Sequence, residues 1–79
     1  MNEISYTNKE VELAIGKEDG AWYVQTTDLN TETEYSECVV DGVSYIQALN
    51  ALKKAMIKYN MGYQNWSAEN IEEDLKYVE

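Results

Sequence analysis

The sequence contains no histidine, no arginine and no proline, and it has a single cysteine, Cys38. Histidine is the most common general base in enzymes, so its absence argues against acid–base catalysis. A lone cysteine forms no disulfide within the chain, which fits a reducing compartment. Without histidine or a second cysteine, one chain does not supply the ligands of a zinc site. We therefore expect a protein that is not an enzyme and that carries neither a metal ion nor a cofactor.

Long apolar runs are also missing. No stretch approaches the roughly 18 consecutive apolar residues that suggest a membrane-spanning helix. The segment 1–10 lacks the basic and apolar regions of a signal peptide. We expect a cytoplasmic protein that does not contact membranes, built as a single domain over residues 1–79.

Acidic residues dominate the charge, with 15 Asp and Glu against 6 Lys and a net charge of −9. The two signs are segregated, because residues 43–61 hold three lysines and no acid while residues 1–42 hold ten acids and two lysines. A surface of this kind repels the phosphates of nucleic acids and membranes and is attracted to basic proteins. We expect a basic protein partner and no direct nucleic-acid binding.

The clearest periodic segment covers residues 44–61. Its apolar residues recur at helical three- and four-residue steps: Ile46, Leu49, Leu52, Met56 and Tyr59. Ser44 and Gln47 have the spacing of a capping box at the start of a helix. Lys58 and Gly62 favour a helix end near residue 61. We expect one long helix over 44–61 with this stripe buried against another layer.

Three segments before this helix have the pattern of strands. Residues 10–15 alternate between polar and apolar, residues 21–27 are rich in aromatic and β-branched side chains, and residues 34–40 alternate again. The segment 16–20, with glycine at both ends, predicts a hairpin turn. The pair Asp41-Gly42 predicts a second turn before the helix.

The remaining segments complete the predicted fold. Strict alternation within 34–40 puts Glu37 and Val40 on opposite faces of the third strand. Residues 1–6 fit either a frayed lead-in or a short strand, and residues 68–77 predict a short helix with acids near its N-terminus. The predicted fold class is α+β, in the order β-β-β-α-α: a three-stranded antiparallel sheet packed by one long helix and followed by a short acidic C-terminal helix.

Two local patterns resemble chemical sites but fit structural roles better. Cys38 lies in a predicted strand, where no histidine is present to activate it. The segment Asp28–Glu32 has the spacing that opens a calcium loop, but Thr33 and Val39 stand where such a loop needs glycine and glutamate. We expect neither pattern to carry chemistry.

Acidic residues before and within the third strand and on the last helix are the candidates that remain. With two nearby aromatic residues, the candidate partner-binding residues are Asp28, Glu32, Glu34, Glu37, Tyr63, Trp66, Glu69, Glu72, Glu73 and Asp74. Carboxylates at fixed positions can stand in for phosphates and accept charge-assisted hydrogen bonds, and Tyr and Trp are favoured in interface hot spots. The alternative is that the acids only keep the domain soluble and that the aromatic pair closes the core. The net charge exceeds the magnitude of ~2–8 that suffices for solubility, which favours binding.

The segment Ala55–Val78, together with the acidic balance and the β-β-β-α-α order, resembles one of the small phage-borne anti-CRISPR proteins that inhibit the type II RNA-guided DNA nuclease. The matching residues are Gly62, Tyr63, Trp66, Glu69, Ile71, Glu72, Glu73, Asp74 and Leu75. The resemblance implies that acidic residues on loops and on the last helix occupy the site where the nuclease reads its short DNA motif with arginines.

The segment Glu12–Ala55 is similar to HicB-like antitoxin domains, which share the order strand, turn, strand, loop, strand, helix. The residues that carry this similarity are Glu18-Asp19-Gly20, Trp22-Tyr23-Val24, Asp28-Leu29 and Ala48–Leu52. The resemblance implies an antitoxin that neutralises a small ribonuclease.

Both resemblances imply an acidic, non-enzymatic partner of a basic protein. We expect an inhibitor of phage or mobile-element origin that works in the host cytoplasm. It would bind a nuclease or CRISPR effector of a host defence system as a mimic of DNA or RNA phosphates. The alternatives are an antitoxin-like domain and a homodimeric structural domain, and the sequence leaves open whether the chain is a monomer or a homodimer.

Overall fold

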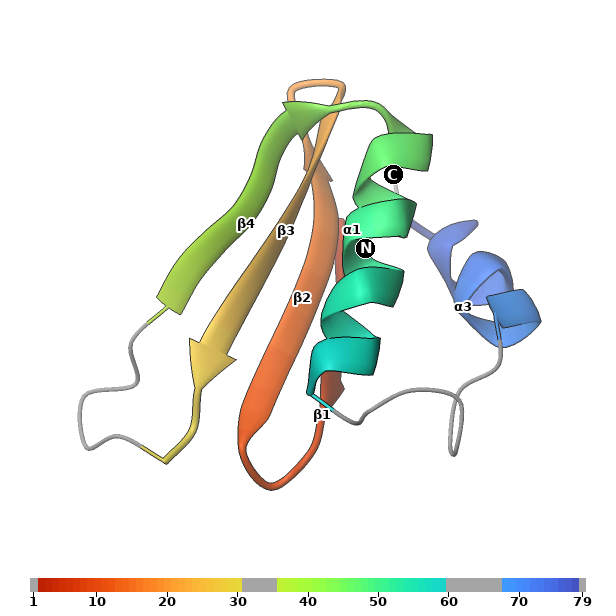
Figure 1. Ribbon diagram of the computed structural model, residues 1–79. Helices are drawn as coiled ribbons and strands as arrows, with labels where there is room; N and C mark the ends of the chain where they lie inside the picture. The colour runs from red at the N-terminus through yellow and green to blue at the C-terminus, as the bar shows by residue number, and fades with distance from the viewer. Residues whose placement is uncertain (1, 31–35, 60–67, 79) are drawn as a thin grey trace.

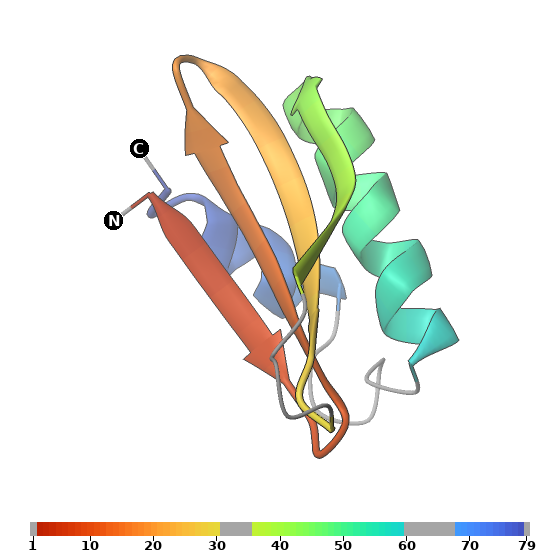
Figure 2. The ribbon, with the colours of Figure 1, turned by 90° about the vertical axis from the view of Figure 1, so that its left-hand side faces the viewer.

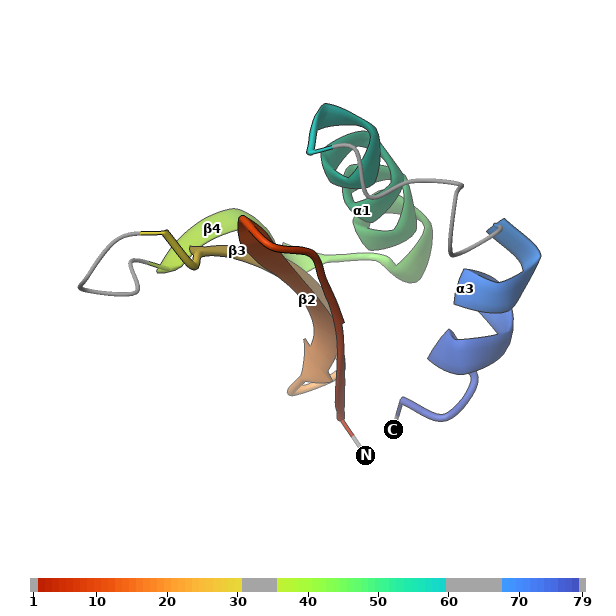
Figure 3. The same ribbon diagram turned by 90° about the horizontal axis from the view of Figure 1, so that it is seen from below.

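The computed structural model describes residues 2–30, 36–59 and 68–78. Its elements are β1 (Glu3–Thr7), β2 (Val11–Glu18), β3 (Ala21–Asp28), β4 (Ser36–Val43), α1 (Tyr45–Lys58) and α3 (Ala68–Leu75). The strands form one antiparallel sheet in the order β1-β2-β3-β4. Both helices lie on the same side of this sheet, with α3 beside β1 and β4 reaching beyond α1 (Figures 1 and 3). The predicted α+β class, with an antiparallel sheet and two helices, is confirmed.

The prediction of three strands is wrong, because the sheet has four strands. The additional strand is β1, so the short-strand alternative for the N-terminal segment holds. Its pairing runs from Glu3 opposite Gly16 to Thr7 opposite Glu12, and it turns Tyr6 into the core at 2% exposure. Five residues are too few to show a clear alternation of polar and apolar side chains in the sequence. The strand forms because it pairs with β2.

The hairpin between β2 and β3 is tighter than the predicted turn over 16–20. Its two turn residues are Asp19 (φ 53°) and Gly20 (φ 82°), and positive φ at both positions is the geometry of a two-residue hairpin loop. Gly16 lies within β2 opposite Tyr23. A Cβ at Gly16 would meet the Asn2 carbonyl oxygen and the Tyr23 hydroxyl at 2.5 Å, so close packing requires this glycine.

Strand β4 continues through Asp41-Gly42, the predicted turn, and ends at Val43. Two register shifts against β3 accommodate the additional residues, and Gly42 takes a φ of 66° there. One shift lies at Val39, because Val24 pairs with Val40 while Gln25 pairs with Cys38. In such a β-bulge, one strand carries an extra residue that has no pairing partner on the neighbouring strand. The strict alternation predicted for residues 34–40 is therefore wrong at Val39.

The bulge changes which side chains of β4 face the helices. Glu37 pairs with Thr26, and Val40 pairs with Val24. Thr26 and Val24 are two residues apart on β3, so they share one face of the sheet. Glu37 and Val40 consequently lie on that same face, the one that carries the core, and not on opposite faces.

Helix α1 confirms its predicted start. Ser44 is the N-cap, and its hydroxyl accepts from the Gln47 amide at 3.2 Å while the Gln47 side chain accepts from the Ser44 amide. The helix ends at Lys58, short of the predicted residue 61, with Tyr59 as its C-cap. Gly62 lies outside the described residues. Ile46 was predicted to be buried but is 60% exposed, because it projects to the side of the buried stripe.

The core lies between the sheet and the two helices. Its buried apolar residues are Tyr6, Val11, Leu13, Ile15, Val24, Ala48, Leu49, Leu52, Ala55, Met56, Ile71, Leu75 and Val78. Helix α3 supplies Ile71 and Leu75 to this core, and Val78 follows the helix. The helix itself stops at Leu75, and Tyr77 beyond it is 67% exposed.

Candidate functional site

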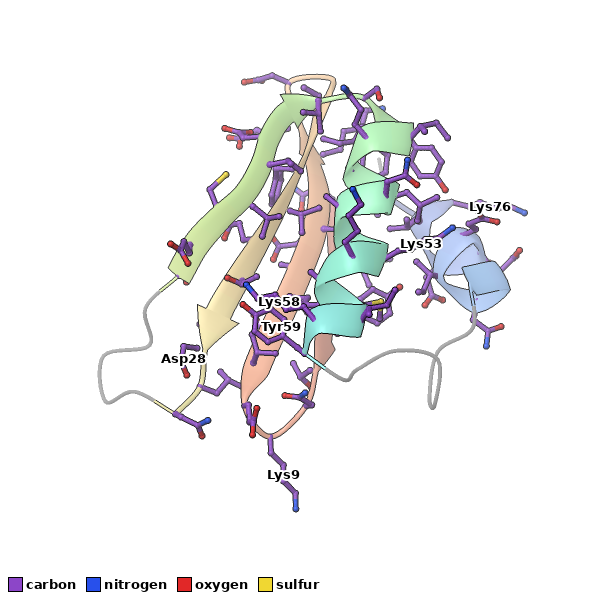
Figure 4. The ribbon with its side chains drawn as sticks, in the orientation of Figure 1. Lys9, Asp28, Lys53, Lys58, Tyr59 and Lys76 are labelled. Carbon is purple, nitrogen blue, oxygen red and sulfur yellow. The ribbon has the colours of Figure 1, made fainter. Side chains whose placement is uncertain are left out.

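The predicted partner-binding residues fall into two separated groups. Asp28 ends β3 and Glu37 begins β4, whereas Glu72, Glu73 and Asp74 lie on α3. Figure 4 shows Asp28 and the α3 side chains on opposite sides of α1. The sequence treated these acids as one surface, and the structure does not bring them together.

The other predicted residues contribute no described side chain. Glu69 lies on α3, where only its backbone is described. The remaining four lie outside the described residues: Glu32, Glu34, Tyr63 and Trp66. The roles proposed for them from the sequence remain predictions.

Each described carboxylate on α3 has a partner within the chain. Glu72 lies 3.9 Å from the ammonium of Lys53 on α1, and Glu73 lies 3.1 Å from Lys76. Asp74 accepts a hydrogen bond of 3.2 Å from the Tyr6 hydroxyl on β1. Glu72 and Asp74 therefore take part in holding this helix against α1 and the sheet, whereas the Glu73–Lys76 pair is local to the C-terminal segment.

The Tyr6–Asp74 contact is the most enclosed of these interactions. Tyr6 is 2% exposed, and the contact joins residues 68 positions apart in the chain. Burial raises the pKa of the Tyr6 hydroxyl well above its ordinary value, and the charge of Asp74 and its hydrogen bond raise it further. A neutral, donating tyrosine is thus the form that the folded state favours.

A second acidic group surrounds a hollow at one end of the sheet. The carboxylates that line it come from the β1–β2 hairpin, the end of β3 and the start of β4, and they are Glu10, Asp28 and Glu37. The hollow measures about 260 Å³, and no lysine is among its described lining residues. Its position follows from the sheet pairing, since Val11 of β2 lies opposite Asp28 of β3.

Local hydrogen bonds set the shape of this end of the sheet. The Asp28 carboxylate accepts from the Asn30 amide at 2.8 Å, and Asn8 accepts from the amides of Glu10 and Val11 at 2.7 and 2.8 Å. These are turns closed by Asn and Asp side chains. The Leu29 amide also donates to the Glu10 carbonyl at 2.9 Å, which ties the two loops together.

Glu10 is the residue of this group that the sequence analysis missed. In the sequence it is one more acid at the start of a strand, with no motif around it. Only the pairing of β2 with β3 places it next to Asp28. The sequence indicates that a strand begins after Glu10, but it does not indicate which other strand pairs with this one.

A longer groove lies between β4 and α1. It measures about 560 Å³, and its apolar lining consists of Val39, Val40, Ala51, Ala55 and Tyr59. Lys54 and Lys58 line its helix side, and Glu37 borders both this groove and the acidic hollow. The ammonium of Lys58 lies 5.3 Å from the centre of the Tyr59 ring, a cation–π contact at the lower end of α1 (Figure 4).

The opposite face of the sheet holds a structural contact. Tyr23 lies across Gly16, and its hydroxyl donates a hydrogen bond to the Glu3 carboxylate on β1. Burial, followed by this hydrogen bond and the charge of Glu3, raises the pKa of Tyr23 from 10.0 to about 12. The contact joins β1 to β3 across the intervening strand.

Within the described parts of the chain, no group of three Cys, Asp or Glu side chains is arranged to hold a metal ion. Neither described helix is long and apolar enough to cross a membrane. The arrangement offers two binding features instead, an acidic hollow and an adjoining groove with an apolar floor. Comparisons with protein-family models, with curated proteins and with solved structures each found no match.

Proposed function

We propose that this protein is a non-enzymatic inhibitor that binds a basic, nucleic-acid-handling protein of a host defence system. Its carboxylates would take the places of nucleic-acid phosphates on that protein. The observation that carries the proposal is the hollow at the end of the sheet, lined by Glu10, Asp28 and Glu37 without a lysine. The net charge of −9 supports it, because it favours encounter with a basic surface over long range.

The geometry of the hollow suits the recognition of arginine or lysine side chains. Its carboxylates come from three separate elements that the sheet holds together. Carboxylates accept strong charge-assisted hydrogen bonds from guanidinium and ammonium groups. A rigid sheet keeps the acids in place, which lowers the entropy lost on binding.

The acids of α3 take a secondary place in this proposal. Glu72, Glu73 and Asp74 already have partners at 3.9, 3.1 and 3.2 Å. A basic partner that engaged them would compete with Lys53, Lys76 and the Tyr6 hydroxyl. We therefore assign the first contact to Glu10 and Glu37 at the end of the sheet.

Affinity capture from host lysate tests the proposal, with the purified protein as bait and two variants of equal charge. Glu10→Gln/Glu37→Gln neutralises the hollow, and Glu72→Gln/Glu73→Gln is the matched control on α3. The expected result is capture of a basic nucleic-acid enzyme that elutes with salt and is displaced by double-stranded DNA or RNA. The captured enzyme should lose activity when the inhibitor is added, and the hollow variant should lose both effects.

Two outcomes would contradict the proposal. Equal capture by the hollow variant and the wild type would show that the hollow is not the contact. Capture of one small ribonuclease that resists salt and ignores added nucleic acid would favour an antitoxin-like protein in place of a phosphate mimic.

A further inference from the structure

The groove between β4 and α1 is a part of the core-bearing face that neither described helix covers. Figure 3 shows β4 extending beyond α1 on the side away from α3, and Figure 2 shows α1 next to β4 while α3 lies near β1 on the same face of the sheet. Val39 on the bulge of β4 is 42% exposed at this groove. On the helix side, the apolar lining continues with Ala51, Ala55 and Tyr59. Both elements that form the groove therefore contribute apolar side chains to its floor.

The charges around the groove are of opposite sign on its two sides. The helix side carries Lys54 and Lys58, whereas the β4 side carries the exposed acid Glu37, and β4 has no lysine. Among the described residues, no ion pair or hydrogen bond engages the Lys54 side chain. Helix α1 also has no acid of its own, while the rest of the chain is strongly acidic.

This distribution makes the surface complementary to itself. A two-fold symmetric interface brings the same patch of two copies together, so each residue that contacts a second one is contacted by it in return. A patch with a basic helix on one side and an acidic strand on the other satisfies that condition. The helix lysines of one copy then face the strand carboxylates of the other, while the apolar floor is covered in both.

We propose that the groove between β4 and α1 is the interface of a homodimer, with a second copy of this chain as its occupant. Each copy sets the α1 side of its groove against the β4 side of the other. Val39 and the rest of the apolar floor lose their exposure to water in the dimer, which supplies the hydrophobic contribution. Opposite charges across the interface fix its orientation. Glu37 borders both the groove and the acidic hollow, so a second copy and a basic partner would compete for this carboxylate, and dimerisation is tested on the protein alone.

Sedimentation equilibrium tests the proposal over a protein range up to about 1 mM. About 0.15 M salt should be present, so that the repulsion between two chains of net charge −9 is screened beyond about 8 Å. The expected species has twice the 9.1 kDa mass of the chain. Lys54→Glu and Val39→Asp should each weaken dimerisation by about tenfold or more.

Two controls separate the groove from general effects of charge and surface polarity. Lys9→Glu makes the same charge change as Lys54→Glu at the β1–β2 hairpin, where the side chain points away from the body of the molecule (Figure 4). Tyr77→Asp places an acid on an apolar side chain that is 67% exposed beside α3. Both control variants should dimerise like the wild type.

The single cysteine provides a second measurement. Cys38 is exposed and is one of the residues that line the groove, so its thiol reports on whether a second copy covers the groove. Alkylation of the Cys38 thiol should slow as the wild-type concentration rises into the dimer range, whereas in Lys54→Glu it should stay equally fast at every concentration. A monomer throughout the concentration range would overturn the proposal, as would a dimer that Lys54→Glu and Val39→Asp leave unchanged.

Discussion

The two acidic regions of this protein are built from the same residue types but differ in how the fold uses them. On α3, the carboxylates of Glu72, Glu73 and Asp74 lie against Lys53, Lys76 and the Tyr6 hydroxyl. At the end of the sheet, Glu10, Asp28 and Glu37 surround a hollow whose described lining contains no lysine. The first region stabilises the position of a helix, and the second is the surface that we propose presents negative charge to a partner.

This difference shows why the density of acids along a sequence does not locate a binding surface. The last helix has the denser cluster, and it lies in the segment on which the sequence analysis based its expectation of an anti-CRISPR-like inhibitor. Packing against α1 and β1 gives that cluster internal partners. The acids at the end of the sheet are far apart in the sequence and are assembled by strand pairing alone.

The largest expected effect comes from removing the packing that holds α3 in place. Ile71 on α3 is 1% exposed, and Ile71→Ala should lower the free energy of unfolding by about 2–5 kcal/mol through lost burial and the cavity that remains. Urea unfolding followed by circular dichroism measures this change. Ile57→Ala, at a residue that is 60% exposed, is the control and should change stability by less than about 0.5 kcal/mol. Equal effects of the two variants would mean that α3 is not packed as described.

The Tyr6–Asp74 hydrogen bond should give the next largest effect. Tyr6→Phe removes the donor from a partly buried carboxylate and should cost about 1.5–3 kcal/mol, the range for hydrogen bonds to charged groups. The double variant Tyr6→Phe/Asp74→Asn should lose less than the sum of the two single changes, because the two side chains contact each other. Additive losses of stability in this double-mutant cycle would show that the side chains of Tyr6 and Asp74 do not interact.

Alkaline pH should weaken the same tyrosine contacts. The pKa values of Tyr6 and Tyr23 are both raised in the folded state, so folding favours their neutral forms. Their contribution to stability is complete below the ordinary tyrosine pKa of 10.0 and is lost as the pH rises through about 12, the folded-state value of Tyr23.

Thermal melts at a series of pH values above 9 measure this loss, with absorbance at the tyrosinate band as a direct readout of ionisation. Replacing both tyrosines by phenylalanine should make the fall in melting temperature with pH shallower. Ionisation of the lysines still contributes to the fall that remains. A decline that is equally steep in the double variant would assign the effect to other groups.

Neutralising exposed acids should have the smallest effects on folding. Glu73→Gln removes an exposed pair with Lys76 and should cost about 0.2–0.5 kcal/mol. Glu10→Gln/Glu37→Gln should change stability by less than about 0.5 kcal/mol while abolishing partner capture. Unfolding curves of both variants, recorded beside the capture experiment, check this separation of stability from binding. A strongly destabilised hollow variant would show that these acids are structural as well.

Local signals predicted the parts of the fold that depend on neighbours in the sequence. Helix α1 starts where the Ser44–Gln47 capping box put it, and Leu49, Leu52 and Met56 are buried as the helical period required. The β2 and β3 segments were found for the same reason, since alternation and turn residues act over a few positions. The failure of Ile46 to be buried marks the limit of this approach, because the width of the buried stripe depends on what lies against it.

The sequence by itself thus determined the fold class, the long helix, the negative charge and the absence of histidine and arginine. Tertiary structure decided the rest: that β1 is a strand, that a bulge at Val39 turns Glu37 toward the helices, and that Glu10 stands beside Asp28. It also decided which carboxylates have internal partners. The physical reason is that strand pairing, register and ion pairing join residues far apart in the chain, and their energies depend on contacts that local sequence does not specify.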